Sequence, residues 1–343
     1  MKIEIGNHLV GDDEPTFVIA EAGANHNRNF DMAKRLIDVA ADAKADAVKF
    51  QTYSAETLYS KKTPKFSFLK GQSAYDLIKS VELPREWQSD LADYANKKGI
   101  MFLSTPFDYE AIDELDAIGV PVFKFASFEI VDLPLLKYAA SKQKPIIIST
   151  GMSSLGDIED VLGCIRSAGN EKIALLHCNS LYPTPPEIVN LKAMDTMREA
   201  FKIPVGFSDH TLGFHISLAA IAMGASIIEK HFTLDRSLPG PDHSFAIEPD
   251  ELKMLVSQIR DIDAAKGDGI KQRSSLEDAE VYQKARRSII AKCDIPADKV
   301  ITKDMIIIKR PGYGIAPKFL DVVIGRVAKV DIKEDDWITW EMV

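Results

Sequence analysis

Two lysines set in short apolar runs are the residues whose chemistry is easiest to infer. Lys49 stands in the run AVKF, and Lys124 stands in the run FKFAS. Because side chains alternate between the two faces of a strand, each lysine points to the side opposite its apolar neighbours. An ammonium group that points into a protein interior is costly unless it meets an anion. That anion is either a ligand or a carboxylate of the protein itself.

Polar side chains beside these lysines favour a ligand. Gln51 lies two residues after Lys49 and therefore on the same face. Ser127 follows Lys124, and Ser149 ends another apolar run. Two ammonium groups with neutral hydroxyl donors predict a site for a phosphate or a phosphate-carboxylate. The alternative is that each lysine pairs with a local carboxylate as part of the architecture.

Two histidines follow consecutive apolar runs further along the chain. His210 follows GFSD, and His231 follows IIEK. If these runs form neighbouring strands, both imidazoles can reach one cation, and neutral imidazole is a ligand for Mn, Zn and Fe. Glu21, which ends the first apolar run, would then hold a water molecule or the substrate. An acid–base role and a structural role for the histidine pair are the alternatives.

The segments that carry these residues alternate between strand and helix patterns. Helical spacing separates eight short β-rich runs, and eight such units in about 250 residues predict a (β/α)8 TIM barrel of the α/β class. The carboxyl ends of the strands build the active site in this fold, and the residues above lie at those ends. The runs are Phe17–Ala20, Ala47–Phe50, Ile100–Leu103, Val120–Phe125, Pro145–Ile148, Ile173–Leu176, Pro204–Phe207 and Ser226–Glu229.

Two regions depart from this regular alternation. The interval Tyr53–Leu83 is about twice the usual length and is expected to form a long loop over the barrel mouth. After residue 265 the pattern changes, which predicts a catalytic barrel over 1–265, a linker over 266–284 and a small β-rich domain over 285–343. Short β runs are expected there, including Val322–Val330. So small a domain is near the limit of independent stability, so it is expected to dock on another surface.

Composition bounds the classes of function. The 343 residues have 46% hydrophobic residues and a formal net charge of −9, which disfavours nucleic acid as a partner. No apolar run is long enough to span a bilayer, so no membrane association is expected. The three cysteines are sparse and form no CxxC motif, which is typical of a cytoplasmic protein. Neither GxGxxG after the first run nor a Walker motif is found.

The ordered motifs resemble those of the sialic acid (N-acetylneuraminate) synthase family, which includes the legionaminate and pseudaminate synthases. The matching segments are FVIAEAGANHN, AVKFQT, FLSTPF, KFAS, IISTGM, LLHCNSLYPTP, GFSDHT and IEKHFTLDRSLPGPDH. The C-terminal RSIIAKCDI, IIIKRPGYGI and VIGRVAKVDIKEDD resemble the antifreeze-like (SAF) domain of that family. The resemblance covers nearly the whole chain.

This resemblance implies a reaction and a set of site residues. The family condenses phosphoenolpyruvate with an open-chain N-acylated mannosamine-type sugar and releases phosphate by C–O cleavage. It implies a divalent cation, most often Mn²⁺ with Mg²⁺ or Co²⁺ as alternatives, on His210 and His231. It places phosphoenolpyruvate on Lys49, Lys124, Ser127, Ser149 and Tyr182, together with Asn179 or Ser180, and it places Glu129 near the reacting carbons.

The resemblance also assigns the sugar side and the oligomer. Gln51, Thr105, Phe107 and Asp242 fall at positions beside the sugar or the metal, and Glu21 would meet the sugar or a metal-bound water. In the family the small domain swaps onto the barrel of a partner in a homodimer. An arginine of the KRPG motif, here Arg310, then reaches the acyl group of the sugar.

Two other classes of function stay open at this stage. A Schiff-base aldolase could act on pyruvate through Lys124 or Lys230. A non-catalytic sugar-binding protein could use the small domain as its binding module, although such a protein has no need of both phosphate and metal ligands. Within the synthase family the acceptor sugar is open, and the KFQT and FVIAEAG forms favour N-acetylmannosamine or the legionaminate precursor over the pseudaminate precursor.

Overall fold

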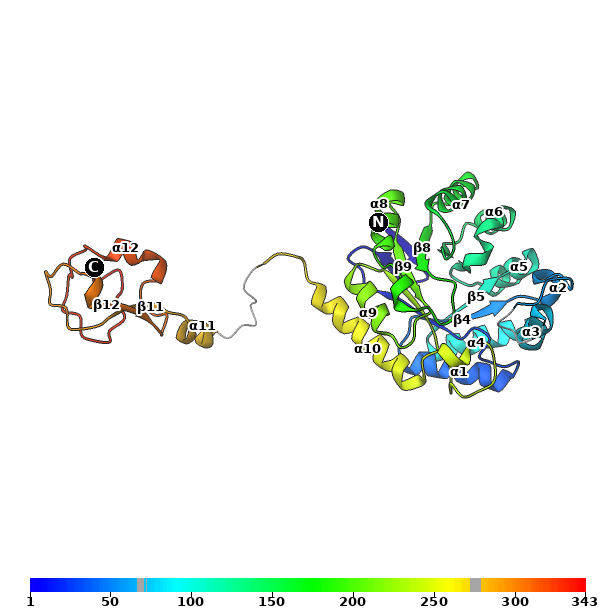
Figure 1. Cartoon of the computed structure of the whole chain (residues 1–343), viewed down its shortest axis with the longest axis horizontal. Coiled ribbons are helices and arrows are strands. Elements are labelled where there is room, and N and C mark those ends of the chain that lie inside the picture. The colour runs from blue at the N-terminus through cyan, green and yellow to red at the C-terminus, as the bar shows by residue number, and fades with distance from the viewer. Residues whose placement is uncertain (67–70, 72, 272–278) are drawn as a thin grey trace. The chain divides into compact units, whose positions relative to one another are not determined.

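The chain folds into two compact units, Met1–Gly267 and Asp268–Val343, shown in Figure 1. The computed structural model describes residues 1–66, 71, 73–271 and 279–343. Within these residues no helix is long and apolar enough to cross a membrane. Each unit has its own hydrophobic core.

The first unit is the predicted barrel. Its eight parallel strands are hydrogen-bonded in the order β5-β4-β3-β10-β9-β8-β7-β6, and β5 packs against β6 at the two ends of that order. The strands are β3 (Phe17–Glu21), β4 (Ala47–Thr52), β5 (Met101–Pro106), β6 (Phe123–Phe125), β7 (Ile146–Ser149), β8 (Ile173–Cys178), β9 (Val205–Asp209) and β10 (Ile227–His231).

Helices follow the strands and surround them (Figure 1). The periodic face predicted for the first helix is buried, and Gly99 ends α4 in the left-handed conformation. Ser154 and Asp157 form a capping box at the start of α7. The helices are α1 (Phe30–Asp42), α4 (Gln88–Lys98), α5 (Tyr109–Ile118), α6 (Leu133–Ser141), α7 (Leu155–Ser167), α8 (Ala193–Phe201), α9 (His215–Ala222) and α10 (Pro249–Lys266).

The inside of the barrel is layered from apolar to polar. At the amino ends of the strands, residues such as Phe17, Ile19 and Leu103 form a dry layer. The hairpin of β1 (Lys2–Ile5) and β2 (His8–Gly11) packs against this layer and closes that end. Above it, towards the carboxyl ends, the inward side chains are charged or polar. The outward side chains, such as Val48 and Phe50, join the core under the helices, as the alternation predicted.

The segment expected to be a loop over the mouth contains two helices. These are α2 (Ala55–Leu58), capped by Ser54, and α3 (Ala74–Val81), capped by Ser73. Each serine side chain accepts a hydrogen bond from the backbone at the third helical residue, which stabilises the helix start. The expected long loop is therefore partly helical, and residues 67–70 and 72 lie outside the described residues.

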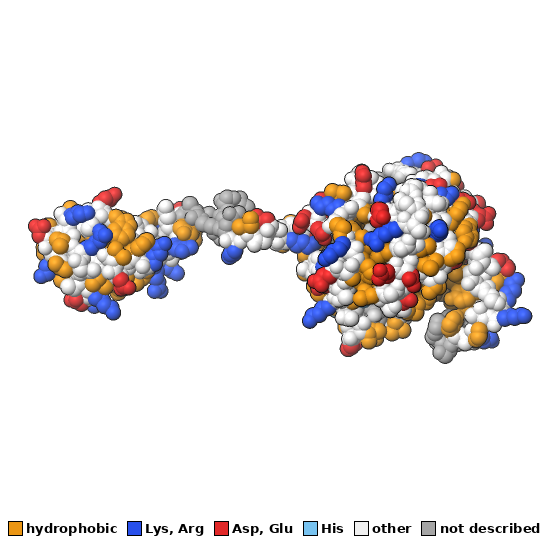
Figure 2. All heavy atoms as spheres, turned by 90° about the horizontal axis from the view of Figure 1, so that it is seen from above, with side chains coloured by type: hydrophobic (Ala, Val, Ile, Leu, Met, Phe, Trp, Pro, Cys, Tyr) orange, Lys and Arg blue, Asp and Glu red, His pale blue; other side chains and the backbone are white. Residues whose placement is uncertain are grey.

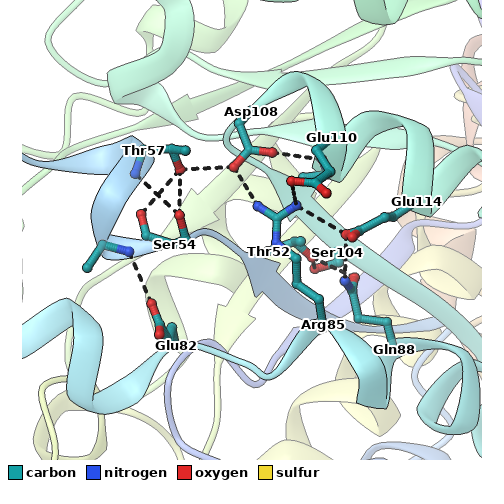
Figure 3. Close-up of polar contacts among 12 residues, drawn as sticks. Thr52, Ser54, Thr57, Glu82, Arg85, Gln88, Ser104, Asp108, Glu110 and Glu114 are labelled. Carbon is teal, nitrogen blue, oxygen red and sulfur yellow. Dashed lines mark hydrogen bonds and ion pairs between the residues drawn. The ribbon is translucent and has the colours of Figure 1, made fainter.

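A polar network ties this segment to the barrel (Figure 3). Arg85, in the short 3-10 helix Arg85–Trp87, pairs with Asp108 and Glu114, and the Asp108 carboxylate accepts a hydrogen bond from Thr57 of α2. Thr52 of β4 is hydrogen-bonded to Gln88, and its hydroxyl lies 2.7 Å from that of Ser104 in β5. The network fixes the outward neighbours of Gln51 and Thr105, two of the predicted site residues.

The second unit is small and only partly β-structured. It contains α11 (Ala279–Ala285), the antiparallel pair β11 (Ser288–Ala291) and β12 (Ile306–Lys309), and α12 (Leu320–Val323). The strand expected over Val322–Val330 is wrong at its start, where α12 lies, and Val327 makes only an isolated bridge to Val300. The predicted linker 266–284 ends in α11, and its residues 272–278 lie outside the described residues.

Candidate active site

A narrow cavity at the carboxyl ends of the strands gathers most of the predicted site residues. Every strand except β6 ends there in at least one inward polar group, and β6 contributes Lys124 from its centre. The lining residues are Glu21, Lys49, Gln51, Thr105, Lys124, Ala126, Ser127, Ser149, Cys178, Tyr182, Ser208, His210, Glu229 and His231. We call this the mouth cavity.

Lys49 is held by two carboxylates at the base of the mouth cavity. Its Nζ lies 2.7 Å from Oε2 of Glu21 and 3.7 Å from Oε2 of Glu229, and it donates to the Thr105 hydroxyl at 3.0 Å. Gln51 donates to the other oxygen of Glu21 at 2.8 Å. The side chain of Lys49 is only 3% exposed, so its charge depends on these partners.

Glu229 is the group that sequence reasoning missed. Its Oε1 lies 3.5 Å from Nζ of Lys124 and accepts a hydrogen bond from Ser208 at 2.9 Å. Glu229 therefore contacts both inward lysines, and its Oε2 has no hydrogen-bond partner among the described residues. The signal was available, because Glu229 lies two residues before His231 and must share its face.

Burial and ion pairing shift the pKa values of the two carboxylates of this cluster in opposite directions. Burial raises the pKa of Glu21 to about 7, although the adjacent Lys49 opposes the rise. Burial acts on Glu229 in the same direction, but Lys124 and Lys49 outweigh it and bring its pKa down to about 2. For Lys49, the two carboxylates outweigh burial and raise the pKa, whereas burial prevails at Lys124 and lowers it. Glu229 is thus the permanent counter-charge of the two lysines.

Hydroxyl groups gather around Gly151 beside the lysines. Ser127 accepts a hydrogen bond from the Gly151 amide at 2.9 Å, and a Cβ on Gly151 would lie 2.4 Å from the Ser180 hydroxyl. The hydroxyls of Ser149 and Ser180 are buried without a partner among the described residues. These unpaired donors face the region where the sequence predicted a phosphate. The side chain of Asn179 instead donates to the Ile188 carbonyl at 3.0 Å.

The histidine pair lies at the rim of the mouth cavity. The ring centroids of His210 and His231 are 5.4 Å apart, and the Tyr182 ring lies 4.2 Å from that of His210. Nδ1 of His210 lies 2.8 Å from the Asn179 carbonyl, which accepts its hydrogen bond and leaves Nε2 as the ring nitrogen with a lone pair. Burial lowers the pKa of His210 to about 4 and that of His231 well below its usual value.

The donor set fits a divalent cation. Nδ1 of His231 is buried without a hydrogen-bond partner in the described part of the chain, as a nitrogen kept for a ligand would be. Oδ2 of Asp242 lies 3.9 Å from Nδ1 of His231. No group of three or more His, Cys, Asp or Glu side chains is arranged to hold a metal among the described residues. A cation held by the two imidazoles alone would keep its remaining positions open to water or substrate.

Comparison with known proteins identifies the family of this chain. Residues 36–271 match the NeuB family model, and residues 286–343 match the SAF domain model. The chain belongs to the NeuB family. It is 46% identical to an N,N'-diacetyllegionaminic acid synthase from Campylobacter jejuni, over 94% of this chain and 98% of that protein. It is 35% identical to an N-acetylneuraminate-9-phosphate synthase from Homo sapiens, over 97% of this chain and 94% of that protein.

A solved structure has the same fold as this NeuB-family chain. The N-acetylneuraminic acid (sialic acid) synthetase from Leptospira borgpetersenii in complex with citrate is 37% identical to it, with a TM-score of 0.75. The match covers 82% of this chain and 95% of that one. The barrel and SAF domain that the sequence predicted are therefore confirmed.

The remaining predicted residues lie at the edges of the NeuB-family site or outside it. Phe107 packs edge-on against Tyr53 at 5.5 Å beside the cavity, and Asp242 accepts a hydrogen bond from the Ala24 amide at 3.0 Å. Glu129 lies in the turn after β6, and its Oε2 is buried without a partner in the described residues. Arg310 follows β12 in the second unit and is exposed there.

A larger cavity at the opposite end of the barrel does not carry this chemistry. It has a volume of about 720 Å³, and Arg260 and Asp263 are among its lining residues. These two side chains hold Thr16, since Arg260 donates to its carbonyl at 2.5 Å and Asp263 accepts from its amide at 2.8 Å. These contacts hold the amino end of β3 in place, whereas active sites of this fold are built at the carboxyl ends of the strands.

Gly23 leaves room for the histidine side of the mouth cavity, which gives a first prediction. Its φ is +51°, and a Cβ there would lie 2.6 Å from Asp242 Oδ2 and 3.3 Å from the His231 ring. The Gly23→Ala variant is expected to lose about 1–2 kcal/mol of unfolding free energy from the left-handed backbone. It should also lose at least about tenfold in kcat/KM, because a shift of about 1 Å in the site is costly.

Gly99→Ala is the matched control for this substitution. Gly99 also has a left-handed φ, +75°, but a Cβ there would meet nothing within 4 Å. Denaturant unfolding should show similar losses for both variants, while only Gly23→Ala loses turnover. Equal turnover of the two variants would contradict the proposed contact of Gly23 with the site.

Glu129 gives a second prediction, on the pH dependence of stability. Burial raises its pKa to about 7, with the Lys124 charge opposing the rise. The folded protein therefore holds this proton more tightly than the unfolded chain, so the stabilisation is complete below pH 4.5 and is lost as the pH rises through 7. Glu129→Gln should remove up to about 3 kcal/mol of this loss between pH 5 and 8.

The measurement is urea unfolding of the NeuB-family chain at several pH values without ligands. Glu159→Gln, on the exposed face of α7, is the control and should leave the pH profile unchanged. A Glu129→Gln profile that parallels the wild type from pH 5 to 8 would show that Glu129 is not the titrating group.

Proposed function

We propose that this chain is a nonulosonic acid synthase. It condenses phosphoenolpyruvate with N-acetylmannosamine or a close analogue to form a nine-carbon 2-keto acid of the N-acetylneuraminate type and phosphate. The alternative acceptor is 2,4-diacetamido-2,4,6-trideoxymannose, which gives N,N'-diacetyllegionaminate. The Campylobacter jejuni relative supports that alternative, and the Leptospira structure supports the first. A pseudaminate precursor is a third candidate.

The observation that supports this function is that two buried lysines line one cavity beside unpaired hydroxyls. Phosphoenolpyruvate has a carboxylate and a phosphate and bears about three negative charges. Lys49 and Lys124 supply the cations, and Ser127, Ser149 and Ser180 supply neutral donors. Ser180, rather than Asn179, is the phosphate contact in this proposal, because its hydroxyl lies beside Gly151 while the Asn179 amide is engaged.

We further propose that His210 and His231 hold a divalent cation, with Mn²⁺ as the first choice and Mg²⁺ or Co²⁺ as alternatives. When bound, this ion supplies Lewis acidity at the aldehyde oxygen of the sugar. The Tyr182 ring packs against that of His210 at a tilt of 42° and restricts its orientation. Asp242 and Glu21 flank His231 and accept hydrogen bonds from water or from the sugar.

The bonds that form and break in this reaction indicate what the carboxylates of the site would do. The C3 carbon of phosphoenolpyruvate forms a bond with the aldehyde carbon, and the aldehyde oxygen takes a proton from a protonated carboxyl group of the site. Water then adds to C2, and a nearby carboxylate takes the proton that this water loses. Glu129 and Glu21 have pKa values of about 7, so each can hold and release a proton near neutrality. The tetrahedral centre collapses: the C–O bond to phosphate breaks, the C2 hydroxyl gives its proton to the departing phosphate, and the 2-keto acid forms.

The sugar side completes the proposal. Gln51, Thr105 and Phe107 lie along the β4 and β5 side of the opening and would contact the acceptor sugar. Positioning two substrates in one cavity contributes a large share of catalysis, of order 7 kcal/mol in good cases.

One assay tests the function. The full chain is incubated with phosphoenolpyruvate, Mn²⁺ and each of the three candidate sugars, and released phosphate and product mass are measured. Phosphate release with a new 2-keto acid for one sugar supports the proposal and names the acceptor. Borohydride trapping of a pyruvate adduct, without phosphate release, would instead favour the aldolase. Lys230 could not serve such an aldolase from the mouth cavity, because it pairs with Asp209 on the outer face of the sheet.

We also propose a domain-swapped homodimer in the cytoplasm, with no nucleic acid or membrane as partner. Exposed apolar side chains follow four consecutive strands at one half of the mouth, namely Phe128, Met152, Leu181 and Leu212. Figure 2 shows that hydrophobic side chains lie among charged ones on the surface of the first unit. A partner's SAF domain would cover the four apolar side chains and bring Arg310 to the sugar.

Arg310→Ala should then raise KM for the sugar more than KM for phosphoenolpyruvate, and a fully active monomer of residues 1–280 would refute the swap.

A further inference from the structure

A buried ion pair lies on the outer face of the barrel, behind the histidine pair. Nζ of Lys230 is 3.1 Å from Oδ2 of Asp209, and both side chains are at most 1% exposed. The register of β10 with β9 sets these two residues side by side. Since Glu229 and His231 line the mouth cavity, alternation places Lys230 on the opposite face of β10.

The two members of this pair directly precede the two histidines in the sequence. Asp209 comes before His210, and Lys230 comes before His231. The ion pair therefore links the two strand ends at the points where the imidazoles leave the barrel wall. A movement of either strand end relative to the other would change the distance between the rings, which is now 5.4 Å between centroids.

Further hydrogen bonds connect this ion pair to the residue that follows His210. Oδ1 of Asp209 accepts from the amide of Thr211 at 2.8 Å and from its hydroxyl at 2.7 Å. Nζ of Lys230 donates to the Thr211 carbonyl at 2.6 Å, and Ser217 of α9 donates to Asp209 Oδ2 at 2.6 Å. The residue on each side of His210 is thus anchored to one buried network.

Stability alone is a poor reason for such a pair. Desolvation of two charges in the interior offsets most of their attraction, and a buried ion pair is often no more stabilising than apolar side chains of similar volume. Its hydrogen bonds instead converge on the turn that carries His210. We propose that Asp209 and Lys230 are positioning residues that set the spacing and orientation of His210 and His231 for a divalent cation. This inference rests on the proposed cation site.

Mn²⁺ binding without substrates tests the inference. Free Mn²⁺ is followed by electron paramagnetic resonance as it is titrated into the full chain, with the His210→Ala/His231→Ala double variant as the baseline for adventitious sites. Outer contacts of metal ligands contribute on the order of 10- to 100-fold in affinity. Lys230→Met and Asp209→Asn should therefore weaken Mn²⁺ binding at least about tenfold. In turnover, the Mn²⁺ requirement should rise while KM for phosphoenolpyruvate stays within about twofold.

Asp46→Asn is the matched control. Asp46 is a largely buried aspartate that pairs with Arg260 at 2.8 Å and accepts from the Val18 amide at 2.7 Å, at the amino ends of the strands. This variant should bind Mn²⁺ like the wild type. Equal weakening by Asp46→Asn would overturn the inference, because general loosening of the barrel would then explain the effect.

Two further outcomes are decisive. Mn²⁺ affinity of folded Lys230→Met and Asp209→Asn variants within twofold of the wild type would overturn the positioning role while leaving the cation site in place. Wild-type binding no tighter than the baseline variant would refute the cation site itself. If either single variant fails to fold by circular dichroism, the uncharged Asp209→Asn/Lys230→Met variant is measured against the same limits, since it leaves no buried charge unpaired.

Discussion

Replacement of His231 or His210 by alanine is expected to lower phosphate release from phosphoenolpyruvate and the acceptor sugar at least about 1000-fold. In the proposed function the two imidazoles would hold the cation that polarises the aldehyde, which is worth several kcal/mol, so its loss reaches this scale. Circular dichroism and thermal unfolding should change little, because each ring makes few hydrogen bonds with the protein.

His215→Ala is the control for this pair of variants. His215 begins α9 and is exposed, so its loss should leave turnover and the Mn²⁺ requirement unchanged. Full activity of His210→Ala or His231→Ala in the presence of a chelator would refute the assignment of the cation to this pair.

The second large effect is expected for Lys124→Ala, as a rise of about 100-fold in KM for phosphoenolpyruvate. A hydrogen bond to a charged group contributes about 1.5–3 kcal/mol, and each 1.4 kcal/mol corresponds to tenfold in affinity. Lys124 also neutralises Glu229, so its removal leaves that carboxylate facing the incoming anion with one cation fewer. Initial rates at saturating sugar and Mn²⁺ measure the effect.

Lys144→Ala serves as its control, because Lys144 pairs with Asp116 outside the cavity at 2.9 Å. Its saturation curve should match the wild type. An unchanged KM for phosphoenolpyruvate in Lys124→Ala would remove Lys124 from the anion site. Retained phosphate release in that variant would also argue against a Schiff base at this lysine.

Strand alternation explains how much of the site could be predicted. The inward direction of Lys49 and Lys124 follows from their apolar neighbours, which pack under the helices. The same rule applied to His231 places Glu229, two residues earlier on β10, on the inner face as well. What alternation cannot give is distance, so the contact of Glu229 with both lysines required the structure.

Local composition misled the prediction elsewhere. The segment after β4 is rich in Lys and Ser, and this concealed the capping serines Ser54 and Ser73 that begin its two helices. In the small unit, the β-branched pair in Leu320–Val323 suggested a strand, yet four residues pack as a helical turn against the SAF core. The choice between Asn179 and Ser180 depended on tertiary contacts that no local pattern encodes.

The apolar layer and the β1–β2 hairpin close the barrel at the amino ends of its strands, so the mouth cavity opens at the carboxyl ends. A ligand that reaches Lys49 and Lys124 would enter past the rim where the proposed function places the sugar. In the proposed function, access from one side would order the turnover cycle: phosphoenolpyruvate, the deeper reactant, would bind before the sugar, and phosphate would leave after the larger product.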